Sequence, residues 1–363
     1  MMKKNLFFFL PNFSAGGAGK SILNMCKKIN RKKFNLHIIS IKKNFYKKKF
    51  QNAGCKVYEI DTTRTVFAYY FIIKDIISKF SKRSVIFISN INYANTLSTI
   101  YLKIFNSYPL VLTERTPIQE LNYGYGLLDK IKKLLIKILM ILIYRKSDLV
   151  ICNSKKISSD IKKYTGSNTE FIYPILEKKK KFKIIRPRGK FRIISIGRLS
   201  IEKKFNDIIK AISKINKSEI ELVLLGDGPE KEKLIKNIKL FSLKAKVLPY
   251  SDFKEKKYLS KSNLFINSSD FEGFPNAVVS SINNSVPVIS TRSHGGINEI
   301  LLNGKGGFFY DQSNIDQLSN LIVYIKKNYS LAIKKTKKSH KKLNRFSANE
   351  NIKKFERLID KIK

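Results

Sequence analysis

A short polar segment at residues 267–277, NSSDFEGFPNA, carries the residue types best suited to chemistry. Glu272 lies just past a predicted strand and ahead of a helix that we expect to begin near Pro275 or Asn276. A carboxylate in this position can accept hydrogen bonds from ligand hydroxyl groups. The N-terminus of the following helix can hold a phosphate, because its first backbone N–H groups lack partners inside the helix. The segment therefore predicts a site for a ligand that carries both hydroxyl and phosphate groups.

Two basic residues, Arg198 and Lys203, follow a strong strand signal at residues 191–196. Arginine offers a planar fork of donors and lysine a movable charge, so a loop that holds both can neutralise one pyrophosphate. Because the chain contains 72 lysines and arginines, a solvated surface is the alternative for this pair taken alone. Residues 226–229, GDGP, end another predicted strand, and Gly226 permits close approach of a neighbouring backbone.

A glycine-rich loop near the N-terminus spans residues 14–21, SAGGAGKS. A Walker A P-loop needs glycine six positions before its lysine, and that position is Ser14, so the sequence disfavours a P-loop NTPase. We expect instead a turn at Gly16 and Gly17 that leads into a helix and offers backbone N–H groups to a phosphate. A tight turn without a ligand is the alternative.

Short runs rich in apolar and β-branched residues recur along the chain, separated by amphipathic stretches of helical length. Many are apolar at consecutive positions, which is typical of strands buried on both faces of a parallel sheet. Two such series predict an α/β protein with two Rossmann-like, doubly wound parallel-sheet domains. The predicted strands span residues 5–10, 35–41, 56–60, 85–89, 110–113 and 149–152 in the first series, and 191–196, 220–225, 246–248, 264–267, 287–290 and 307–310 in the second.

A charge run followed by proline and glycine, residues 177–189, separates the two series and is typical of a linker. We therefore expect an N-terminal domain at residues 1–173, a linker at 174–190 and a C-terminal domain at 191–345. Residues 346–363 are predicted to form an amphipathic helix that crosses back to the N-terminal domain.

The formal net charge of +45 is the dominant property of the composition. Such a field attracts anions of every kind, including nucleic acids, anionic lipids and phosphorylated substrates. Compositional drift explains the same charge, since Lys, Ile and Asn are abundant throughout. No recognisable nucleic-acid-binding module accompanies the charge, so we expect no specific nucleic-acid partner. We do expect peripheral contact with an anionic membrane surface, where each nearby Lys or Arg contributes on the order of 1 kcal/mol.

Membrane insertion and metal binding are not expected. No apolar run reaches about 18 residues, and the short run at residues 6–10 lacks a following cleavage site, which favours a buried strand over a signal peptide. Cys26, Cys55 and Cys152 have no CxxC spacing, which indicates a reducing compartment and no metal site. Residues 131–144 are apolar enough for a membrane interface, but we favour a core helix covered on most sides.

Taken in order, the glycine loop, the Arg–Lys loop, the GDGP turn and the EGFPN segment resemble glycosyltransferase family 4. The VPVIST strand at residues 286–291 and the GGINEI turn at 295–300 extend the resemblance, which is firm over roughly residues 190–310. Over the first half it rests on the glycine loop and on TERT at residues 113–116. Within that family the EGFPN segment resembles the corresponding segment of enzymes that build lipid-linked oligosaccharides, O-antigens and capsules.

The resemblance implies a GT-B fold, with a nucleotide-sugar donor held by the C-terminal domain in the interdomain cleft. It implies a glycan or polyprenyl-linked acceptor on the N-terminal domain, and transfer of a hexose or N-acetylhexosamine with retention of configuration in cell-surface polysaccharide synthesis. No cofactor or metal is expected, and we favour a UDP-sugar over a GDP-sugar. The expected location is cytoplasmic, at the inner face of the cell membrane.

Individual roles follow from the resemblance. Arg198 and Lys203 would neutralise the leaving diphosphate, because positive charge is needed where negative charge develops, and Glu272 would contact the donor sugar. Backbone amides of residues 274–277 would face the donor, and the glycine loop would close over the phosphates from the other domain. The implied donor-binding residues are Gly16, Gly17, Gly226, Phe274, Pro275, Asn276, Ala277 and Ser280.

The sequence also departs from the family at several positions. Ser280 stands where members usually carry a second Glu that binds the nucleotide ribose, and losing such a charge-assisted interaction weakens binding by about 1.5–3 kcal/mol. Lys204 stands where glycine is usual, and Ser285 is the small residue that precedes the VPV strand. A weakened or inactive GT-B relative, a phosphorylase of the same fold and a basic polyanion-binding protein are therefore the alternatives. A histidine near the acceptor is not evident among His37, His294 and His340.

Overall fold

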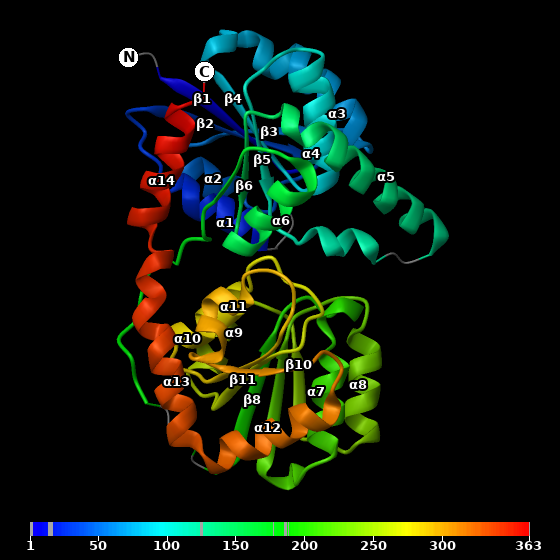
Figure 1. Ribbon diagram of the computed structural model, residues 1–363, viewed down its shortest axis with the longest axis vertical. Coiled ribbons are helices and arrows are strands. Elements are labelled where there is room, and N and C mark those ends of the chain that lie inside the picture. The colour runs from blue at the N-terminus through cyan, green and yellow to red at the C-terminus, as the bar shows by residue number, and fades with distance from the viewer. Residues whose placement is uncertain are drawn as a thin grey trace. The chain divides into compact units, whose positions relative to one another are not determined.

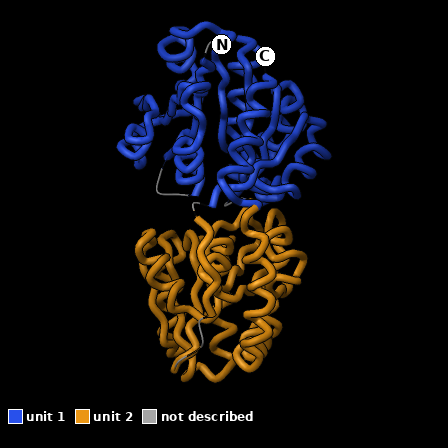
Figure 2. Tube along the Cα trace, turned by 90° about the vertical axis from the view of Figure 1, so that its left-hand side faces the viewer, with its two compact units in different colours: residues 1–177, 345–363 blue, residues 178–344 orange. Residues whose placement is uncertain are grey.

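The computed structural model describes residues 3–13, 17–123, 126–176, 178–184, 187 and 189–362. The chain divides into two compact units: unit 1 comprises residues 1–177 and 345–363, and unit 2 comprises residues 178–344 (Figure 2). Unit 1 is therefore built from two separate parts of the sequence, whereas unit 2 is continuous.

Unit 1 contains a seven-stranded parallel sheet in the order β3-β2-β1-β4-β5-β6-β7 (Figure 1). Because the chain order reverses beside β1, the border between β1 and β4 is the topological switch point of the sheet. The strands are β1 (Lys4–Phe9), β2 (Phe34–Ile41), β3 (Lys56–Ile60), β4 (Val85–Asn90), β5 (Leu110–Glu114), β6 (Leu149–Cys152) and β7 (Thr169–Phe171). The α-helices are α1 (Gly17–Cys26), α2 (Lys47–Asn52), α3 (Thr65–Phe71), α4 (Asn92–Ser98), α5 (Leu127–Ile143), α6 (Lys155–Thr165) and α14 (Ala348–Asp360).

The central strand β1 is apolar at consecutive positions because both faces of the sheet are covered. Leu6 and Phe8 join the core that includes side chains of α1, α2 and α14. Phe7 and Phe9 join the core on the other face, which includes side chains of α3, α4 and α6. The C-terminal helix α14 thus completes one face of the sheet, with the Phe355 ring centroid 6.3 Å from that of Phe8.

Unit 2 contains a six-stranded parallel sheet in the order β10-β9-β8-β11-β12-β13. Its strands are β8 (Phe191–Ile196), β9 (Ile220–Leu225), β10 (Ala245–Leu248), β11 (Leu264–Asn267), β12 (Val288–Thr291) and β13 (Phe308–Tyr310). Its α-helices are α7 (Phe205–Ser213), α8 (Lys231–Leu240), α9 (Asp252–Leu259), α10 (Asn276–Asn283), α11 (Ile297–Ile300), α12 (Ile315–Lys327) and α13 (Tyr329–Lys341). The switch point of this sheet lies between β8 and β11.

The predicted fold class is confirmed: both units are doubly wound, all-parallel α/β structures. Each predicted strand corresponds to a strand of the structure, with ends that differ by a residue at most. The edge strand β7 was not predicted. Residues 178–184 of the predicted linker pack in unit 2, where the backbone N–H of Lys180 donates to Asn283 Oδ1 at 2.8 Å and that of Lys183 donates to Ser285 Oγ at 2.9 Å.

Helix α5 corrects the interpretation of residues 131–144 as a covered core helix. Met140 is its one buried residue, whereas Leu127 and Leu128 are 74% and 83% exposed. The helix leaves the body of unit 1 at the right of Figure 1, and most of its leucines and isoleucines face solvent. The sequence could not separate the two possibilities, because a short apolar run such as residues 138–143 suits a buried helix and an interfacial helix alike. Among the described residues, no helix is long and apolar enough to cross a membrane.

Candidate functional site

The loops that follow β8, β9, β11 and β12 form the carboxyl edge of the unit 2 sheet, where ligands of doubly wound proteins bind. Backbone hydrogen bonds connect the first two loops: Gly197 N–H donates to Leu225 O at 3.0 Å, and Leu199 N–H donates to Asp227 O at 2.9 Å. Gly226 is required for this contact, because a Cβ there would lie 1.8 Å from Gly197 O. Gly226 therefore has a packing role, and its predicted contact with the donor stays a prediction.

Lys203 and Glu272, two of the three predicted catalytic residues, lie in direct contact. Lys203 Nζ is 2.6 Å from Glu272 Oε1, and the two side chains are 20% and 17% exposed. Ser269 Oγ donates to the same carboxylate oxygen at 2.8 Å. The sequence analysis did not single out Ser269, although its place three residues before Glu272 indicates a side chain within reach. Because solvent screens this pair only partly, the two charges interact more strongly than an exposed ion pair would.

The Glu272 loop is held by the turn that follows β12. Glu272 N–H donates to His294 O at 3.1 Å, and Gly296 N–H donates to Gly273 O at 2.8 Å. Gly295 has a φ of +112°, and a Cβ there would lie 1.7 Å from Glu272 O. The EGFPN segment and the GGINEI turn of the sequence thus form one structural unit, in which His294 contributes its backbone carbonyl while its side chain is exposed.

Arg198, the third predicted catalytic residue, is exposed in the loop directly after β8. Its backbone carbonyl accepts a hydrogen bond from Ser200 N–H at 2.9 Å. Within the described ranges, its guanidinium has no hydrogen bond or ion pair, so it is not bonded to the Lys203–Glu272 pair. Its role at the diphosphate stays a prediction.

The predicted donor-binding residues of the EGFPN segment lead into helix α10. Phe274 and Pro275 are buried, Asn276 is exposed, and Ala277 and Ser280 are half-buried. The first turn of α10 carries no acidic residue, so the partial positive charge at this N-terminus is not neutralised from within the helix. The arrangement suits a phosphate, and a ribose contact at Ser280 stays a prediction.

Lys204 shows why glycine suits its position. Its backbone has φ +49° and ψ +35°, the left-handed conformation in which residues other than glycine are strained by roughly 1–2 kcal/mol. Its Nζ lies 3.5 Å from Asp270 Oδ2, so the side chain has a partner of its own beside the Lys203–Glu272 pair. Ser285, the small residue before β12, also has a positive φ, of +64°.

The glycine loop is described in part. Gly16 lies outside the described residues, whereas Gly17 is exposed and begins α1, whose first turn contains no acidic residue. Their phosphate contacts stay predictions. His37 is buried, stacks on Phe7 at 4.2 Å between ring centroids, and has its pKa lowered to about 4 by burial, so it is a core residue.

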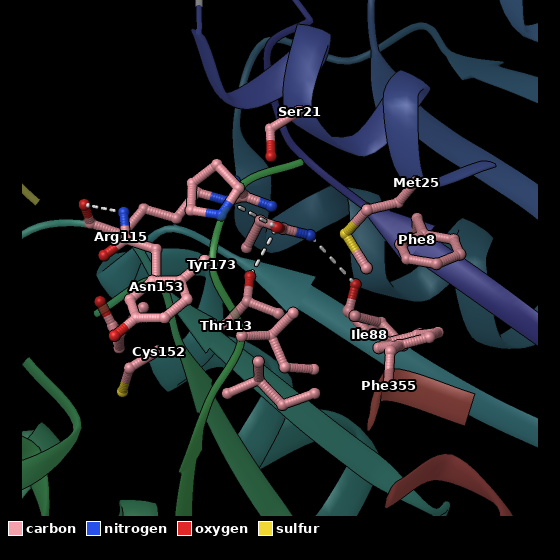
Figure 3. Close-up of a pocket in the computed structure, with 15 residues that line it drawn as sticks. Phe8, Ser21, Met25, Ile88, Thr113, Arg115, Cys152, Asn153, Tyr173 and Phe355 are labelled. Carbon is pink, nitrogen blue, oxygen red and sulfur yellow. Dashed lines mark hydrogen bonds between the residues drawn. The ribbon is translucent and has the colours of Figure 1, made fainter. Parts of the chain in front are cut away.

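A second cluster of polar groups lies at the carboxyl edge of the unit 1 sheet, where TERT follows β5. Glu114 is 2% exposed and accepts hydrogen bonds at Oε1 from Tyr144 Oη at 2.5 Å and from Asn95 Nδ2 at 2.7 Å. Burial raises the pKa of this carboxyl to about 7, although both hydrogen bonds act in the opposite direction. Beside it, Arg115 lines a pocket with Asn90 and other residues (Figure 3). In the part of the chain that the structure describes, no group of His, Cys, Asp and Glu could hold a metal ion.

Sequence comparison finds one family that matches part of this chain, and individual proteins that are similar to it. Residues 177–350, which include all of unit 2, match the family described as Glycosyl transferases group 1. The N-acetylgalactosamine-N,N'-diacetylbacillosaminyl-diphospho-undecaprenol 4-alpha-N-acetylgalactosaminyltransferase of Campylobacter jejuni is 28% identical over 237 residues, which are 63% of this chain and 62% of that protein. The poly(glycerol-phosphate) alpha-glucosyltransferase of Bacillus subtilis is 28% identical over 165 residues, 44% of this chain and 24% of that protein. The chain thus spans less than two thirds of the length of either relative.

Structural comparison extends over the whole chain. The crystal structure of Anabaena Alr3699/HepE in complex with UDP matches with a TM-score of 0.80 and 16% identity, covering 99% of this chain and 100% of that one. At this identity the likeness shows the fold. With its two Rossmann-like parallel sheets, the fold is the GT-B fold of glycosyltransferases.

Proposed function

We propose that the protein is a retaining glycosyltransferase of family 4 that transfers a hexose or N-acetylhexosamine from a nucleotide sugar to a glycan or polyprenyl-linked acceptor in cell-surface polysaccharide synthesis. The observation that carries the proposal is the contact between Lys203 and Glu272 at the carboxyl edge of a Rossmann-like sheet. The family match over residues 177–350 supports it, since that stretch contains both residues.

The chemistry of transfer needs both members of this pair. A nucleoside diphosphate that leaves a sugar gains negative charge, and a fixed cation in a partly buried site stabilises that charge. Lys203 supplies a partly buried cation and Arg198 an exposed one. Glu272 accepts hydrogen bonds from sugar hydroxyls. Without a ligand the two charges of the pair neutralise each other, and a donor that carries hydroxyls and a diphosphate can replace their mutual contact with a contact for each.

The proposed donor is a UDP-sugar in preference to a GDP-sugar, and the proposed reaction uses no metal or other cofactor. The UDP complex of the Anabaena protein supports the choice of base. The names of both relatives specify an alpha linkage, which supports transfer with retention from an alpha-linked donor. Both names also specify acceptors with phosphoryl groups, so we propose an acceptor that carries one.

A direct assay tests the function. The purified protein is incubated with UDP- and GDP-sugars, with and without EDTA, and release of the nucleotide and thermal stabilisation are measured. We expect stabilisation and slow hydrolysis with at least one UDP-sugar, and no effect of EDTA. Loss of both signals in Glu272→Ala, with an unchanged melting temperature, would tie them to the site. Stabilisation by a donor without release, even with acceptors of both kinds, would instead favour an inactive relative.

Peripheral contact with an anionic membrane, at the cytoplasmic face where such acceptors would be met, is the second part of the proposal. Helix α5 supports it, because Leu128, Leu134 and Leu135 are exposed on a helix that also carries Lys130, Lys132, Lys133 and Lys137. Exposed apolar side chains enter the headgroup region while lysines attract anionic lipids.

Vesicle co-sedimentation tests this contact. We expect the protein to bind vesicles that contain phosphatidylglycerol, and the variant Leu128→Asp/Leu135→Asp to bind them at least tenfold more weakly. Leu240→Asp in unit 2, where the leucine is 72% exposed, is the matched control. Equal binding of all three proteins would assign the attraction to the overall positive charge and exclude α5.

A further inference from the structure

A pocket opens at the carboxyl edge of the unit 1 sheet, lined by residues at the ends of β4, β5 and β6, by residues just after β7, and by α1 and α14 (Figure 3). It lies beside β1 and β4, the switch point at which doubly wound sheets bind ligands. Its volume of about 30 Å³ is that of roughly two water molecules. Such a space suits a small charged group in contact with the lining residues.

Arg115 is the basic residue that lines this pocket, and it forms no ion pair with Glu114, the carboxyl that also lines it. Its Nε donates to Asn90 Oδ1 at 3.3 Å, a long hydrogen bond to a neutral partner. Among the described residues, no carboxylate forms an ion pair with it. The neighbouring carboxyl of Glu114 instead accepts from Tyr144 and Asn95. Burial lowers the pKa of Arg115 to about 10, so the guanidinium stays charged at neutral pH.

The groups around Arg115 are fixed by hydrogen bonds. Asn90 Nδ2 donates to Phe9 O at 3.0 Å, and Thr113 Oγ1 donates to Asn90 Oδ1 at 2.5 Å. Asn153 Nδ2 donates to Arg115 O at 2.9 Å, which orients its amide and leaves the buried Oδ1 without a hydrogen-bond partner in the described structure. A partly buried cation and a buried acceptor atom, both held in place, form a preorganised polar site.

We propose that the Arg115 pocket binds a phosphoryl group of the acceptor, with the guanidinium bonded to the phosphoryl oxygens and Asn153 Oδ1 accepting from a hydroxyl beside it. The proposal rests on the proposed function and specifies how unit 1 takes part in it. An anion in the pocket supplies the counterion that Arg115 lacks, and the planar fork of arginine matches phosphate geometry. The donor also carries phosphates, but unit 2 offers Arg198 and Lys203 for those.

The experiment measures binding to the full chain by calorimetry, with geranyl diphosphate as the probe for an acceptor and UDP as the probe for the donor. Arg115→Met removes the charge and keeps most of the apolar stem, and Arg115→Lys keeps the charge but loses the fork. Arg83→Met is the control, since this exposed arginine precedes β4 at the opposite end of that strand. Melting temperatures are recorded for each variant.

We expect Arg115→Met to weaken geranyl diphosphate binding by about 10- to 100-fold, the scale for a lost charge-assisted hydrogen bond. Arg115→Lys should lie between that variant and wild type, and Arg83→Met should match wild type. UDP binding should stay unchanged in all of them. The melting temperature of Arg115→Met should not fall, because the substitution removes a cation that lacks a counterion.

Three results would overturn the proposal. Wild-type affinity of Arg115→Met for geranyl diphosphate would show that the pocket does not hold the phosphoryl group. Weaker UDP binding with unchanged geranyl diphosphate binding would assign Arg115 to the donor. A lower melting temperature with unchanged binding of both probes would make Arg115 a structural residue. Because binding is measured without turnover, failure of the proposed transferase activity would not alter these results.

Discussion

The buried carboxyl of Glu114 predicts an unusual dependence of stability on pH. The pKa of this group is about 7 in the folded chain and 4.5 as the ordinary value, so the folded chain binds more protons than the unfolded chain between these two pH values. The free energy of unfolding therefore decreases as pH rises through this window. This difference between the two pKa values lowers the free energy of unfolding by about 3 kcal/mol above pH 7. Because Glu114 is 2% exposed, solvent does little to reduce this effect.

The variant Glu114→Gln tests the prediction, since Gln resembles the protonated carboxyl and can still accept from Tyr144 and Asn95. We expect equal stability of variant and wild type near pH 4, below the ordinary pKa of the carboxyl, and a variant more stable by about 3 kcal/mol at pH 8. Urea unfolding followed by circular dichroism measures the difference, and hydrogen exchange of unit 1 peptides localises it. Glu232→Gln, at an exposed position in α8, is the control. A difference between Glu114→Gln and wild type that does not change with pH would refute the reasoning.

The remaining predictions concern the unit 2 site, and each is checked by the rate of transfer with the donor that the assay above identifies, or by calorimetry. Glu272→Gln and Glu272→Ala should abolish transfer while the melting temperature stays near that of wild type; near-wild-type turnover of the Ala variant would exclude this loop as the site. Arg198→Ala and Lys203→Ala should each lower the rate by about 10²–10³-fold, whereas Lys204→Ala should do much less, because its Nζ pairs with Asp270 beside the site. Equal losses at Lys203 and Lys204 would contradict the contact described for Lys203. Ser280→Glu should tighten UDP binding by up to about 1.5–3 kcal/mol if the position faces the ribose, and unchanged or poorer binding would remove that contact from the proposal.

The sheets were predictable from sequence because their strands are buried on both faces. In β8, for example, Phe191 and residues 193–195 are buried, and a short, mostly apolar run of this length is typical of a strand covered on both faces. The edge strand β7 escaped prediction for the opposite reason. Its three residues, TEF, are all half-buried, so their pattern does not differ from that of a loop.

The residues of the site were predictable from the sequence, but the contacts between them were not. The types of Lys203 and Glu272 indicated their chemistry, but their contact at 2.6 Å joins residues that are far apart in the sequence and depends on the pairing of β8 with β11. Arg115 was noticed as part of a motif, yet its lack of a counterion is a property of its surroundings in space. Helix α5 shows the same limit, because its composition suits a core and an interface equally.

The division of unit 1 across the sequence has a consequence for synthesis of the protein on the ribosome. Unit 2 emerges as one continuous segment and can fold as soon as residue 344 is available. The sheet of unit 1 is made first but must wait for α14, whose Phe355 covers Phe8, and for the residues just after it, where Ile362 O accepts from Lys4 Nζ at 2.8 Å. During that delay the face of β1 that carries Leu6 and Phe8 lacks part of its cover, and such a nascent intermediate is open to aggregation and to capture by chaperones. Unit 1, whose sheet is synthesised first, is therefore the last unit to finish folding.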